Sequence, residues 1–455
     1  MDSENVPGSL PAISSFSNAP FDILAEIFLT CPIPLDELDG DLNYRCHSRS
    51  FTKCLSAWSL SGVCQQWRNA ALSLPVLWST AVVDRRTMGS GRRREGNLAL
   101  LSLLLDRSKN VPLTIHLDCN GDDEDVLNML SPHISRARVL YFGINLYQET
   151  KLGLALRNFL SGPTHFPFLR SLSPWIYSQH QFSSLFPTFA HAPLLERLHV
   201  KMLMVQAQWI DNIGIPWSQI RYHNSVGLLK DINTFLKSLL LMPNLIHLDI
   251  DDISFRYYYL KSKTLPYIRL EYLTCLRLQH ETTCEIWDHL AQLELPALTE
   301  MDLRDVPLGP VKSLLERSKC GSQLSALTLW GTSSGEGGRE TIKEILFMTP
   351  NVVSFDLQSI ADILEQSRDF IQVFTPDPDA GRDGLPSGIL FSKLTTLQIQ
   401  HGKNARLDVK DFMDRVFARE VLPTVKRLSF PRAWGTTVYE ISGVHEVKKT
   451  YYQTW

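Results

Sequence analysis

The chain has 455 residues, of which 44% are hydrophobic and 20% charged, and its formal net charge is −3 at pH 7. This composition is typical of a folded protein with room for two or three domains or one long repeat array. The near-neutral charge predicts no general attraction to nucleic acid or acidic membranes, and the longest apolar runs are too short to span a bilayer.

Residues 1–17 are expected to be disordered and do not look like a signal peptide. The eight cysteines are scattered and form no Cys-x-x-Cys pair. These features favour reduced thiols, so we expect the protein in the cytoplasm, the nucleus or both.

Residues 20–28 are predicted to form the first helix. Pro20 suits a first helical turn, and Asp22 in that turn favours the helix dipole. Apolar residues then recur at helical spacing, at Ile23, Leu24, Ile27 and Phe28.

A second helix is predicted from Trp58 to Leu72, with Trp78 just beyond its end. Its apolar side is one stripe at helical spacing, formed by Leu60, Val63, Cys64, Trp67 and Ala71. A stripe this heavy in a small segment suggests a surface kept for a partner. An ordinary helix packed on the following domain would carry the same stripe, so both interpretations stay open.

Taken in order, these pieces resemble the F-box, through which F-box proteins bind the Skp-family adaptor of cullin–RING ubiquitin ligases. The matching residues read Ala19-Pro20-Phe21-Asp22-Ile23-Leu24-x-x-Ile27-Phe28, then Leu60-x-x-Val63-Cys64-x-x-Trp67-Arg68, then Leu77-Trp78. The resemblance covers residues 18–82 and is similar in style to the large F-box-like family of fungi. It implies an adaptor-binding set of Pro20, Ile23, Leu24, Ile27, Phe28, Leu60, Val63, Cys64, Trp67, Leu77 and Trp78.

The sequence departs from the F-box pattern in two places. The family usually begins Leu-Pro-x-Glu, where this chain has Ala19-Pro20-Phe21-Asp22. It also joins its helices by a short turn, where this chain has residues 31–56. This insert is either a surface excursion, which costs little loop-closure entropy, or a change that weakens adaptor binding.

A basic loop is predicted at residues 83–97, with Arg92, Arg93 and Arg94 in a row. A solvated linker is the favoured interpretation of this loop. A nuclear signal or a contact with an acidic partner is the alternative.

A short pattern, Pro-x-[Leu/Val]-x-x-apolar-x-apolar, recurs down the rest of the chain. Its copies begin at Pro193, Pro243, Pro296, Pro350 and Pro423. Copies without the proline begin at Leu273, Leu324 and Leu394, and degenerate ones at Leu169 and at Trp217-x-x-Ile220-x-Tyr222. The strand at residues 112–117 is expected to begin the series. A period of 22–28 residues with this pattern at its head resembles the leucine-rich repeat.

The segments between these strands carry helical patterns. Predicted helices lie at residues 228–239, 286–293, 311–315 and 342–346. Most end before a proline, which stops a helix and favours extended geometry in the residue before it. Because no unit buries its apolar side alone, we expect a solenoid with a parallel concave sheet and helices on the convex side.

Enzyme and metal signatures are weak. The glycine-rich segment 331–341 lies between a strand and a helix, as phosphate-binding loops do, but it lacks the Gly-Lys-[Ser/Thr] ending. The cysteines and histidine of residues 46–64 do not have zinc-ligand spacing. No Gly-x-Ser-x-Gly or His-Glu-x-x-His motif occurs. We therefore predict no enzymatic activity, no metal and no cofactor.

Function is accordingly expected on surfaces. In each repeat strand, the residues that flank the inward apolar pair point to the concave face. The predicted substrate-binding residues of this face are Arg197, His199, Lys201, His247, Asp249, Arg277, Gln279, Asp302, Arg304 and Trp330. Trp330 is the strongest single candidate, because tryptophan and arginine dominate interface energetics.

The sequence thus predicts an α/β protein with a helical F-box-like domain at residues 18–82, a leucine-rich-repeat solenoid at 98–435 and a C-terminal cap or tail at 436–455. By resemblance, the first part would bind the Skp-family adaptor and through it a cullin. The repeats would bind an unknown protein substrate, with no nucleic acid and no membrane involved. The alternative is a protein-interaction scaffold whose N-terminal helices only cap the solenoid.

Overall fold

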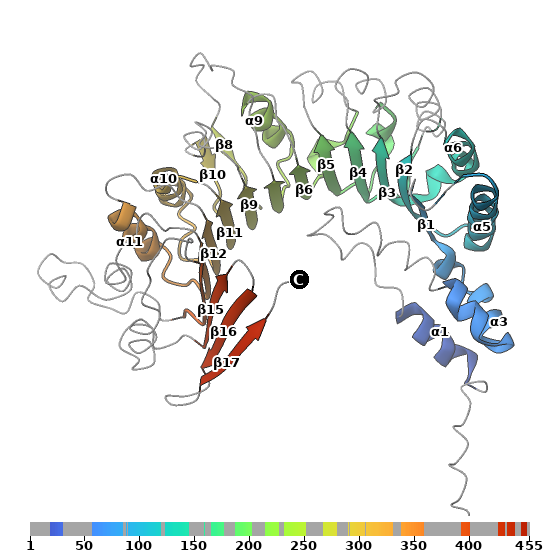
Figure 1. Cartoon of the computed structure of the whole chain (residues 1–455). Coiled ribbons are helices and arrows are strands. Elements are labelled where there is room, and N and C mark those ends of the chain that lie inside the picture. Colours follow the sequence, from blue (N-terminus) through green and yellow to red (C-terminus); the bar gives the residue numbers. More distant parts are fainter. Residues whose placement is uncertain are drawn as a thin grey trace, which may run out of the picture. The chain divides into compact units, whose positions relative to one another are not determined.

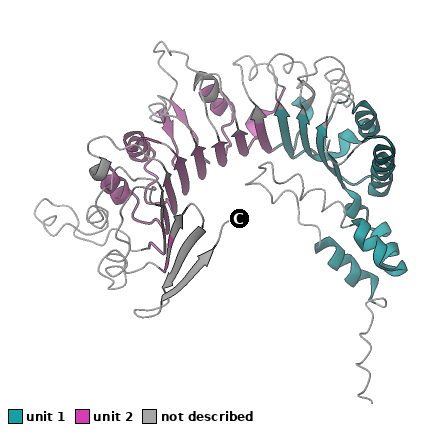
Figure 2. Ribbon diagram, viewed as in Figure 1, with its two compact units in different colours: residues 1–177, 184–195 teal, residues 178–183, 196–455 magenta. Residues whose placement is uncertain are grey.

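The structure of the protein is a computed structural model (Figure 1). The chain forms two compact units, each held together by contacts among its own residues (Figure 2). Unit 1 comprises residues 1–177 and 184–195, and unit 2 comprises residues 178–183 and 196–455. The described residues are 19–30, 57–84, 88, 90–119, 123–144, 159, 165–176, 187–202, 214–226, 232–251, 267–279, 290, 292–304, 306–330, 338–358, 393–400, 426–432, 435–441 and 447–452. The predicted disordered N-terminus at 1–17 and the insert at 31–56 lie outside them.

Unit 1 begins with a small cluster of helices. Helix α1 covers Phe21–Thr30, residues 57–63 are helical, α3 covers Gln65–Ser73, and the 3-10 helix η3 covers Pro75–Trp78. Their fully buried side chains form one core, made of Leu24, Phe28, Ala57, Ala70, Ala71 and Trp78. This helical cluster therefore has an interior of its own.

The second predicted helix is interrupted at Cys64. This residue has an extended backbone, with φ −157° and ψ 173°, and its Sγ accepts a hydrogen bond from the backbone N–H of Trp67 at 3.5 Å. Cys64 thus caps the N-terminus of α3, where the first N–H groups have no partner within the helix. The prediction of one continuous stripe from Leu60 to Ala71 is wrong, because an extended residue separates two helices.

Within its described residues, unit 1 has four parallel strands, each paired with the next. They are β1 at Thr80–Asp84, β2 at Leu113–Cys119, β3 at Ala137–Ile144 and β4 at Ser171–Ile176. The other elements are α5 at Arg92–Ser108, α6 at Glu124–Leu130, and the 3-10 helices η4 at Ser131–Arg136 and η6 at Pro187–His191. Helices α5 and α6 lie on one side of this sheet (Figure 1).

The parallel strands begin earlier than the sequence suggested. Strand β1 lies in the range predicted to hold only helices and a linker, and it pairs in register with β2, with Ala81 beside Ile115. Helix α5 likewise begins at Arg92, inside the predicted linker 83–97. The short run at β1 lacks the leucine pattern of the later units, so a search for that pattern does not find it.

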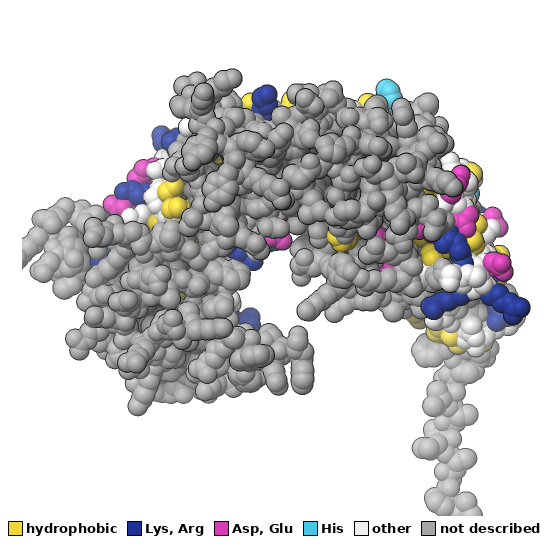
Figure 3. Space-filling view, turned by 45° about the horizontal axis from the view of Figure 1, so that its top comes forward, with side chains coloured by type: hydrophobic (Ala, Val, Ile, Leu, Met, Phe, Trp, Pro, Cys, Tyr) yellow, Lys and Arg dark blue, Asp and Glu magenta, His cyan; other side chains and the backbone are white. Residues whose placement is uncertain are grey.

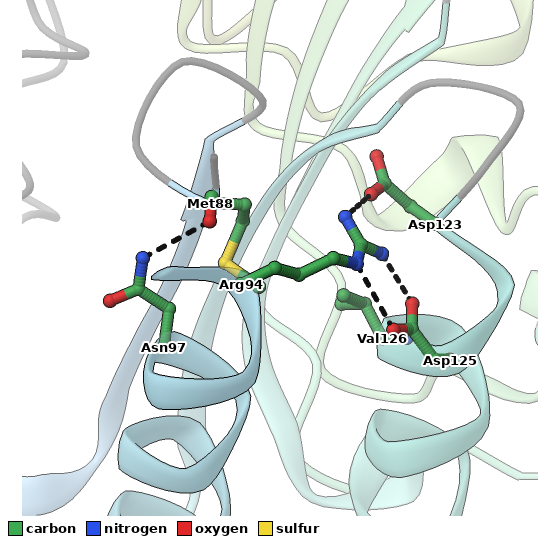
Figure 4. A network of polar contacts seen from close by, with 6 residues as sticks. All are labelled: Met88, Arg94, Asn97, Asp123, Asp125 and Val126. Atoms are coloured by element: carbon green, nitrogen blue, oxygen red, sulfur yellow. Dashed lines mark hydrogen bonds and ion pairs between the residues drawn. The ribbon is translucent and has the colours of Figure 1, made fainter. Parts of the chain in front are cut away.

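Arg94, at the start of α5, is held by two aspartates at the start of α6 (Figure 4). Its Nη1 donates to Asp123 at 2.8 Å, its Nε donates to Asp125 at 3.2 Å, and its Nη2 also donates to Asp125. The hydrogen bonds from Arg94 lower the pKa of Asp125. The prediction of a solvated linker is therefore wrong for Arg94, whereas Arg92 and Arg93 are exposed.

The sheet of unit 2 continues the repeat pattern through nine parallel strands among its described residues. They are β5 at Arg197–Met202, β6 at Tyr222–Val226, β7 at His247–Asp251, β9 at Cys275–Gln279, β11 at Glu300–Arg304, β12 at Ala326–Trp330, β13 at Ser354–Gln358, β14 at Thr396–Gln400 and β15 at Arg427–Arg432. Two antiparallel strands follow, β16 at Gly435–Ile441 and β17 at Val447–Tyr452. The recurring leucine pattern therefore predicts the parallel sheet correctly.

In unit 2, a ladder of hydrogen bonds joins each leucine-pattern repeat to the next, just before the strand of each repeat. The backbone N–H of Thr299 donates to the carbonyl of Thr274 at 2.9 Å, and that of Ser325 donates to the carbonyl of Thr299 at 2.8 Å. The side-chain hydroxyls of Thr299 and Ser325 donate to the same two carbonyls, at 3.1 and 3.0 Å. Because each repeat makes the same contact with the repeat before it, this ladder fixes the spacing of the repeats.

The register of β6 corrects one repeat. The sequence pattern made Trp217 the head of its unit and pointed Tyr222 into the core. In the structure, His223 occupies the core position, paired with a leucine on each neighbouring strand. Tyr222 therefore faces the other side of the sheet. Ile220, not Trp217, is the first residue of the leucine pattern in this repeat, and it lies 25 residues from the first pattern residue of each neighbouring repeat. The apolar side chain of Trp217, in the 3-10 helix η7 at Trp217–Gln219, concealed this register.

The return segments match the helical patterns except at one place. Helices α9 at Ile232–Leu241, α10 at Leu308–Ser318 and α11 at Gly338–Met348 confirm three predictions. Residues 286–289 and 291 of the segment predicted as a helix at 286–293 lie outside the described residues. Leu290 and Gln292 are 3-10 helical, and at Leu293 the prediction is wrong, because strand β10 at Leu293–Glu294 begins there and pairs with β8 at Ile268–Arg269. Leu293 and Leu295 are both buried, so the burial here has the period of two that strands show.

His223 is the unusual residue of the unit 2 core. It is buried between Leu198 and Leu248 on the neighbouring strands. Burial, with a contribution from the nearby His199, lowers its pKa to about 4. The imidazole is therefore neutral near pH 7, and its protonation is opposed by the fold.

We expect the substitution His223→Leu to stabilise unit 2 and to make it less sensitive to acid. The histidine pKa is about 4 in the folded state and 6.5 without the fold, so between these values the unfolded state alone takes up the proton. Stability that is present above pH 6.5 is therefore lost as the pH falls toward 4, by roughly 3 kcal/mol.

Urea denaturation of both proteins near neutral pH and near the folded-state pKa measures this difference. Asp249 and His199 titrate in both proteins, so the comparison isolates His223. An equal loss of stability in acid for both would contradict the expectation.

Candidate functional site

Three predicted adaptor-binding residues lie in the interior of the helical cluster. Leu24, Phe28 and Trp78 each have 0% of their surface exposed. The indole N–H of Trp78 donates to the carbonyl of Ala71 at 2.8 Å, and the ring of Phe28 meets that of Trp67 edge to face, with centroids 5.1 Å apart. Because these side chains are enclosed by the cluster, we correct their role from contact residues to core residues.

The other predicted adaptor-binding residues reach the surface to different degrees. Pro20, Ile23 and Val63 are exposed. The half-buried ones are Ile27, Leu60, Cys64, Trp67 and Leu77. Further exposed apolar side chains on these helices, which the sequence did not single out, are Phe21, Leu29, Leu72 and Val76. In the space-filling view, hydrophobic side chains reach the surface of this part of the chain beside basic ones (Figure 3).

Arg107 links the helical cluster to helix α5 of the same compact unit. Its guanidinium carbon lies 4.7 Å from the ring centroid of Trp58 and 4.4 Å from that of Trp78. The two indoles meet edge to face, with centroids 4.9 Å apart. A cation near two aromatic rings is attracted to both, by about 0.5–2 kcal/mol each. The helical cluster and α5 are therefore packed together within unit 1.

The second candidate surface is the face of the unit 2 sheet that alternates with the buried core positions. We call it the polar face. Its described polar side chains on β5 to β14 are Arg197, His199, Tyr222, Asn224, His247, Asp249, Asp251, Cys275, Arg277, Gln279, Glu300, Asp302, Arg304, Thr328, Ser354, Asp356, Thr396 and Gln398. Eight of the ten predicted substrate-binding residues are among them.

Charged side chains meet across the middle strands of the polar face. Arg277 lies in register between Asp249 on β7 and Asp302 on β11. Arg304 donates to Oε1 of Gln279 at 2.6 Å, and its Nε lies 3.5 Å from a carboxylate oxygen of Asp302. The structure thus brings five predicted residues together as one network.

Asp249 is the carboxyl group most affected by this environment. Burial raises its pKa to about 6, with Arg277 opposing the shift and Asp302 adding to it. The side-chain amide of Asn224 donates a hydrogen bond to its carboxylate at 3.2 Å. Asp249 therefore titrates close to neutral pH, where an exposed aspartate is fully ionised.

At the β5 end of the polar face, an arginine and two rings follow each other across three strands. The guanidinium carbon of Arg197 lies 4.8 Å from the ring centroid of Tyr222, and the rings of Tyr222 and His247 are 6.4 Å apart. Burial, together with Arg197 and His247, lowers the pKa of His199 to about 4. Among the described side chains of β5 and β6, the positive charge is therefore carried by Arg197.

Two predicted substrate-binding residues cannot be placed on this surface. Trp330 and Lys201 lie on β12 and β5, but their side chains are outside the described part of the structure. The sequence overlooked Tyr222 and Asn224, because it misread the register of β6. It also overlooked Asp356, although Asp356 has the same position in its repeat as Asp249 has in the repeat of β7.

The described residues hold neither a metal-binding group nor a membrane-spanning helix. Within the described residues, no three His, Cys, Asp or Glu side chains are grouped so that they could hold a metal ion. No helix in the described ranges has the length and hydropathy needed to cross a membrane. Residues 331–337 and 46–54, which carry most of the phosphate-loop and zinc patterns, are outside those ranges.

No protein-family model matches the chain, and no curated protein does either. One similar solved structure is described as the APL1 leucine-rich repeat domain, with 12% sequence identity, coverage of 76% of this chain and 90% of that chain, and a TM-score of 0.27. The recurring leucine pattern and the parallel strands of the described residues resemble the leucine-rich repeat. The resemblance of residues 18–82 to the F-box stays a prediction.

Proposed function

We propose that this chain is a protein-interaction scaffold that acts as the substrate-recognition subunit of a Skp–cullin–F-box type ubiquitin ligase. The helical cluster binds the Skp-family adaptor, and through it a cullin, while the repeats bind a protein substrate. The chain performs no bond chemistry itself, and its contribution is to hold the substrate close to the ligase. We place this activity in the cytoplasm, the nucleus or both.

The observation that supports adaptor binding is the apolar surface of the helical cluster. The cluster already encloses its own core, yet Phe21, Ile23 and Val63 are 49%, 52% and 61% exposed. Several large apolar side chains on the surface of one small element are typical of an interaction site. Helices that served only as a cap would be expected to bury such residues against the repeats.

A scaffold without a ligase role is the second candidate, and the contacts of Arg107 favour it. Arg107 packs against Trp58 and Trp78, so the helical cluster does cover part of α5. These contacts and the exposed apolar set use different residues. A cap and an adaptor-binding surface are therefore compatible in one small cluster.

The test is the capture of a purified Skp-family adaptor by the full chain, in wild type and with Ile23→Asp and Val63→Asp combined. Both residues are exposed, so the fold should survive, while two carboxylates in an apolar interface should weaken binding at least ~100-fold. Leu240→Asp, on α9 and 48% exposed, is the matched control and should bind normally. Adaptor binding that survives in the double variant, or is absent in wild type, would falsify the ligase role.

A further inference from the structure

Aspartates recur at every second strand in one row of the polar face. The register pairs run from Asp249 through Arg277 to Asp302, and then through Thr328 to Asp356. Neighbouring strands lie about 4.8 Å apart, so the backbones of successive aspartates in this row are about 10 Å apart. The row therefore presents carboxylates at a regular interval across the sheet.

This part of the polar face is acidic as a whole. From β7 to β13, the carboxylates of Asp249, Asp251, Glu300, Asp302 and Asp356 outnumber two guanidiniums, those of Arg277 and Arg304. Arg304 donates a hydrogen bond to Gln279, and its Nε lies 3.5 Å from a carboxylate oxygen of Asp302. The excess of negative charge is complementary to a cationic ligand and opposes an anionic one, such as a nucleic acid.

The pKa of Asp249 is sensitive to a neighbouring cation, because Arg277 already lowers it. Burial raises its pKa to about 6, despite the nearby Arg277. A lysine or arginine of a ligand beside this carboxylate would favour its charged form and lower the pKa again. Binding of a cation is therefore coupled to loss of the proton and strengthens as the pH rises through about 6.

We infer that the polar face of unit 2 binds an extended peptide segment that carries lysine or arginine at every third position. In a polyproline II conformation, every third side chain lies on the same face of the peptide, about 9 Å from the last. That interval matches the spacing of the aspartate row when the peptide runs across the strands. The inference concerns the repeats and holds with or without an adaptor.

The test is fluorescence anisotropy of the full chain with two labelled peptides of one composition. One is Lys-Pro-Ala-Lys-Pro-Ala-Lys, with cations at every third position, and the other is Lys-Lys-Lys-Pro-Ala-Pro-Ala. At low salt and above neutral pH, we expect the spaced peptide to bind at least ~10-fold more tightly, and added salt to weaken it. Equal affinity for the two peptides would overturn the inference.

Substitutions locate the site. Asp302→Asn keeps the shape of the side chain and should weaken the spaced peptide about 10-fold or more. Glu316→Gln removes a carboxylate from the helical side, on α10, and should leave the affinity unchanged. If circular dichroism shows that Asp302→Asn does not fold, Asp356→Asn takes its place with the same expected loss. Unchanged affinity in the folded variant would exclude the aspartate row as the binding site.

The pH dependence is an independent readout. Wild type should bind the spaced peptide more weakly at pH 5 than at pH 7.5, because Asp249 is then protonated, and Asp249→Asn should lose most of this difference. The same pH dependence in Asp249→Asn and in wild type would contradict the part assigned to Asp249.

Discussion

Trp78→Ala is expected to lower the free energy of unfolding of unit 1 by about 3–5 kcal/mol. The indole is fully buried in the helical cluster, and its N–H donates to the carbonyl of Ala71 at 2.8 Å. It also meets Trp58 edge to face and lies beneath the guanidinium of Arg107. Removing it leaves a cavity and a cation with only one of its two rings, and the carbonyl of Ala71 keeps only the backbone N–H of Leu74 as a donor.

Urea denaturation followed by circular dichroism measures this loss. Repeat proteins can unfold in blocks, so the transition of unit 1 is the relevant one. Trp78→Phe keeps a buried ring but loses the indole N–H, and we expect it to cost about 1–2 kcal/mol. Val76→Ala, at a neighbouring site that is 48% exposed, should change stability little. If Trp78→Ala costs no more than Val76→Ala, the indole does not organise this core.

Gly321→Ala is expected to destabilise unit 2 by about 3 kcal/mol or more. A Cβ atom at this position would lie 2.0 Å from the carbonyl oxygen of Met348 and 2.9 Å from its carbonyl carbon. These are backbone atoms at the end of α11, so they cannot move aside by a change of rotamer. Gly321 therefore allows the segments that follow the strands of two successive repeats to approach closely.

Gly309→Ala is the matched control, because a Cβ atom at Gly309 would have nothing within 4 Å. It lies in α10, where alanine is the better helix former, so stability should stay the same or rise by up to ~1 kcal/mol. Thermal and urea unfolding of both variants give the comparison. Equal behaviour of the two would show that the approach of Gly321 to Met348 is not tight in solution.

The repeat strands could be predicted because two independent signals coincide in them. In β7 and β11, apolar residues alternate with polar ones, and a leucine precedes the strand at a fixed distance. Where one signal was missing, the prediction failed. Strand β6 has His223 at a core position, and β1 lacks the preceding leucine. Strand β10 has leucines whose spacing also fits a helix, and its pairing with β8 decides the matter.

The candidate sites were predicted less completely, for a physical reason. Helical spacing identifies apolar faces, but a core and a partner both select apolar residues, so Phe28 and Ile23 look alike in sequence although one is buried and the other exposed. On the polar face, alternation along each strand placed the charges correctly. Burial raises the pKa of Asp249, while Arg277 on another strand opposes the rise and Asp302 adds to it, and only the register of the sheet brings these groups near.

The change of strand direction at the end of the sheet bears on how the protein behaves at high concentration. Parallel repeats have no intrinsic stopping point, and an unpaired last strand is a template for another copy of the chain. Here β16 and β17 turn back antiparallel on β15, so β15 does not present a free parallel edge. End-to-end polymerisation through a further parallel repeat is thereby discouraged at this edge of the sheet.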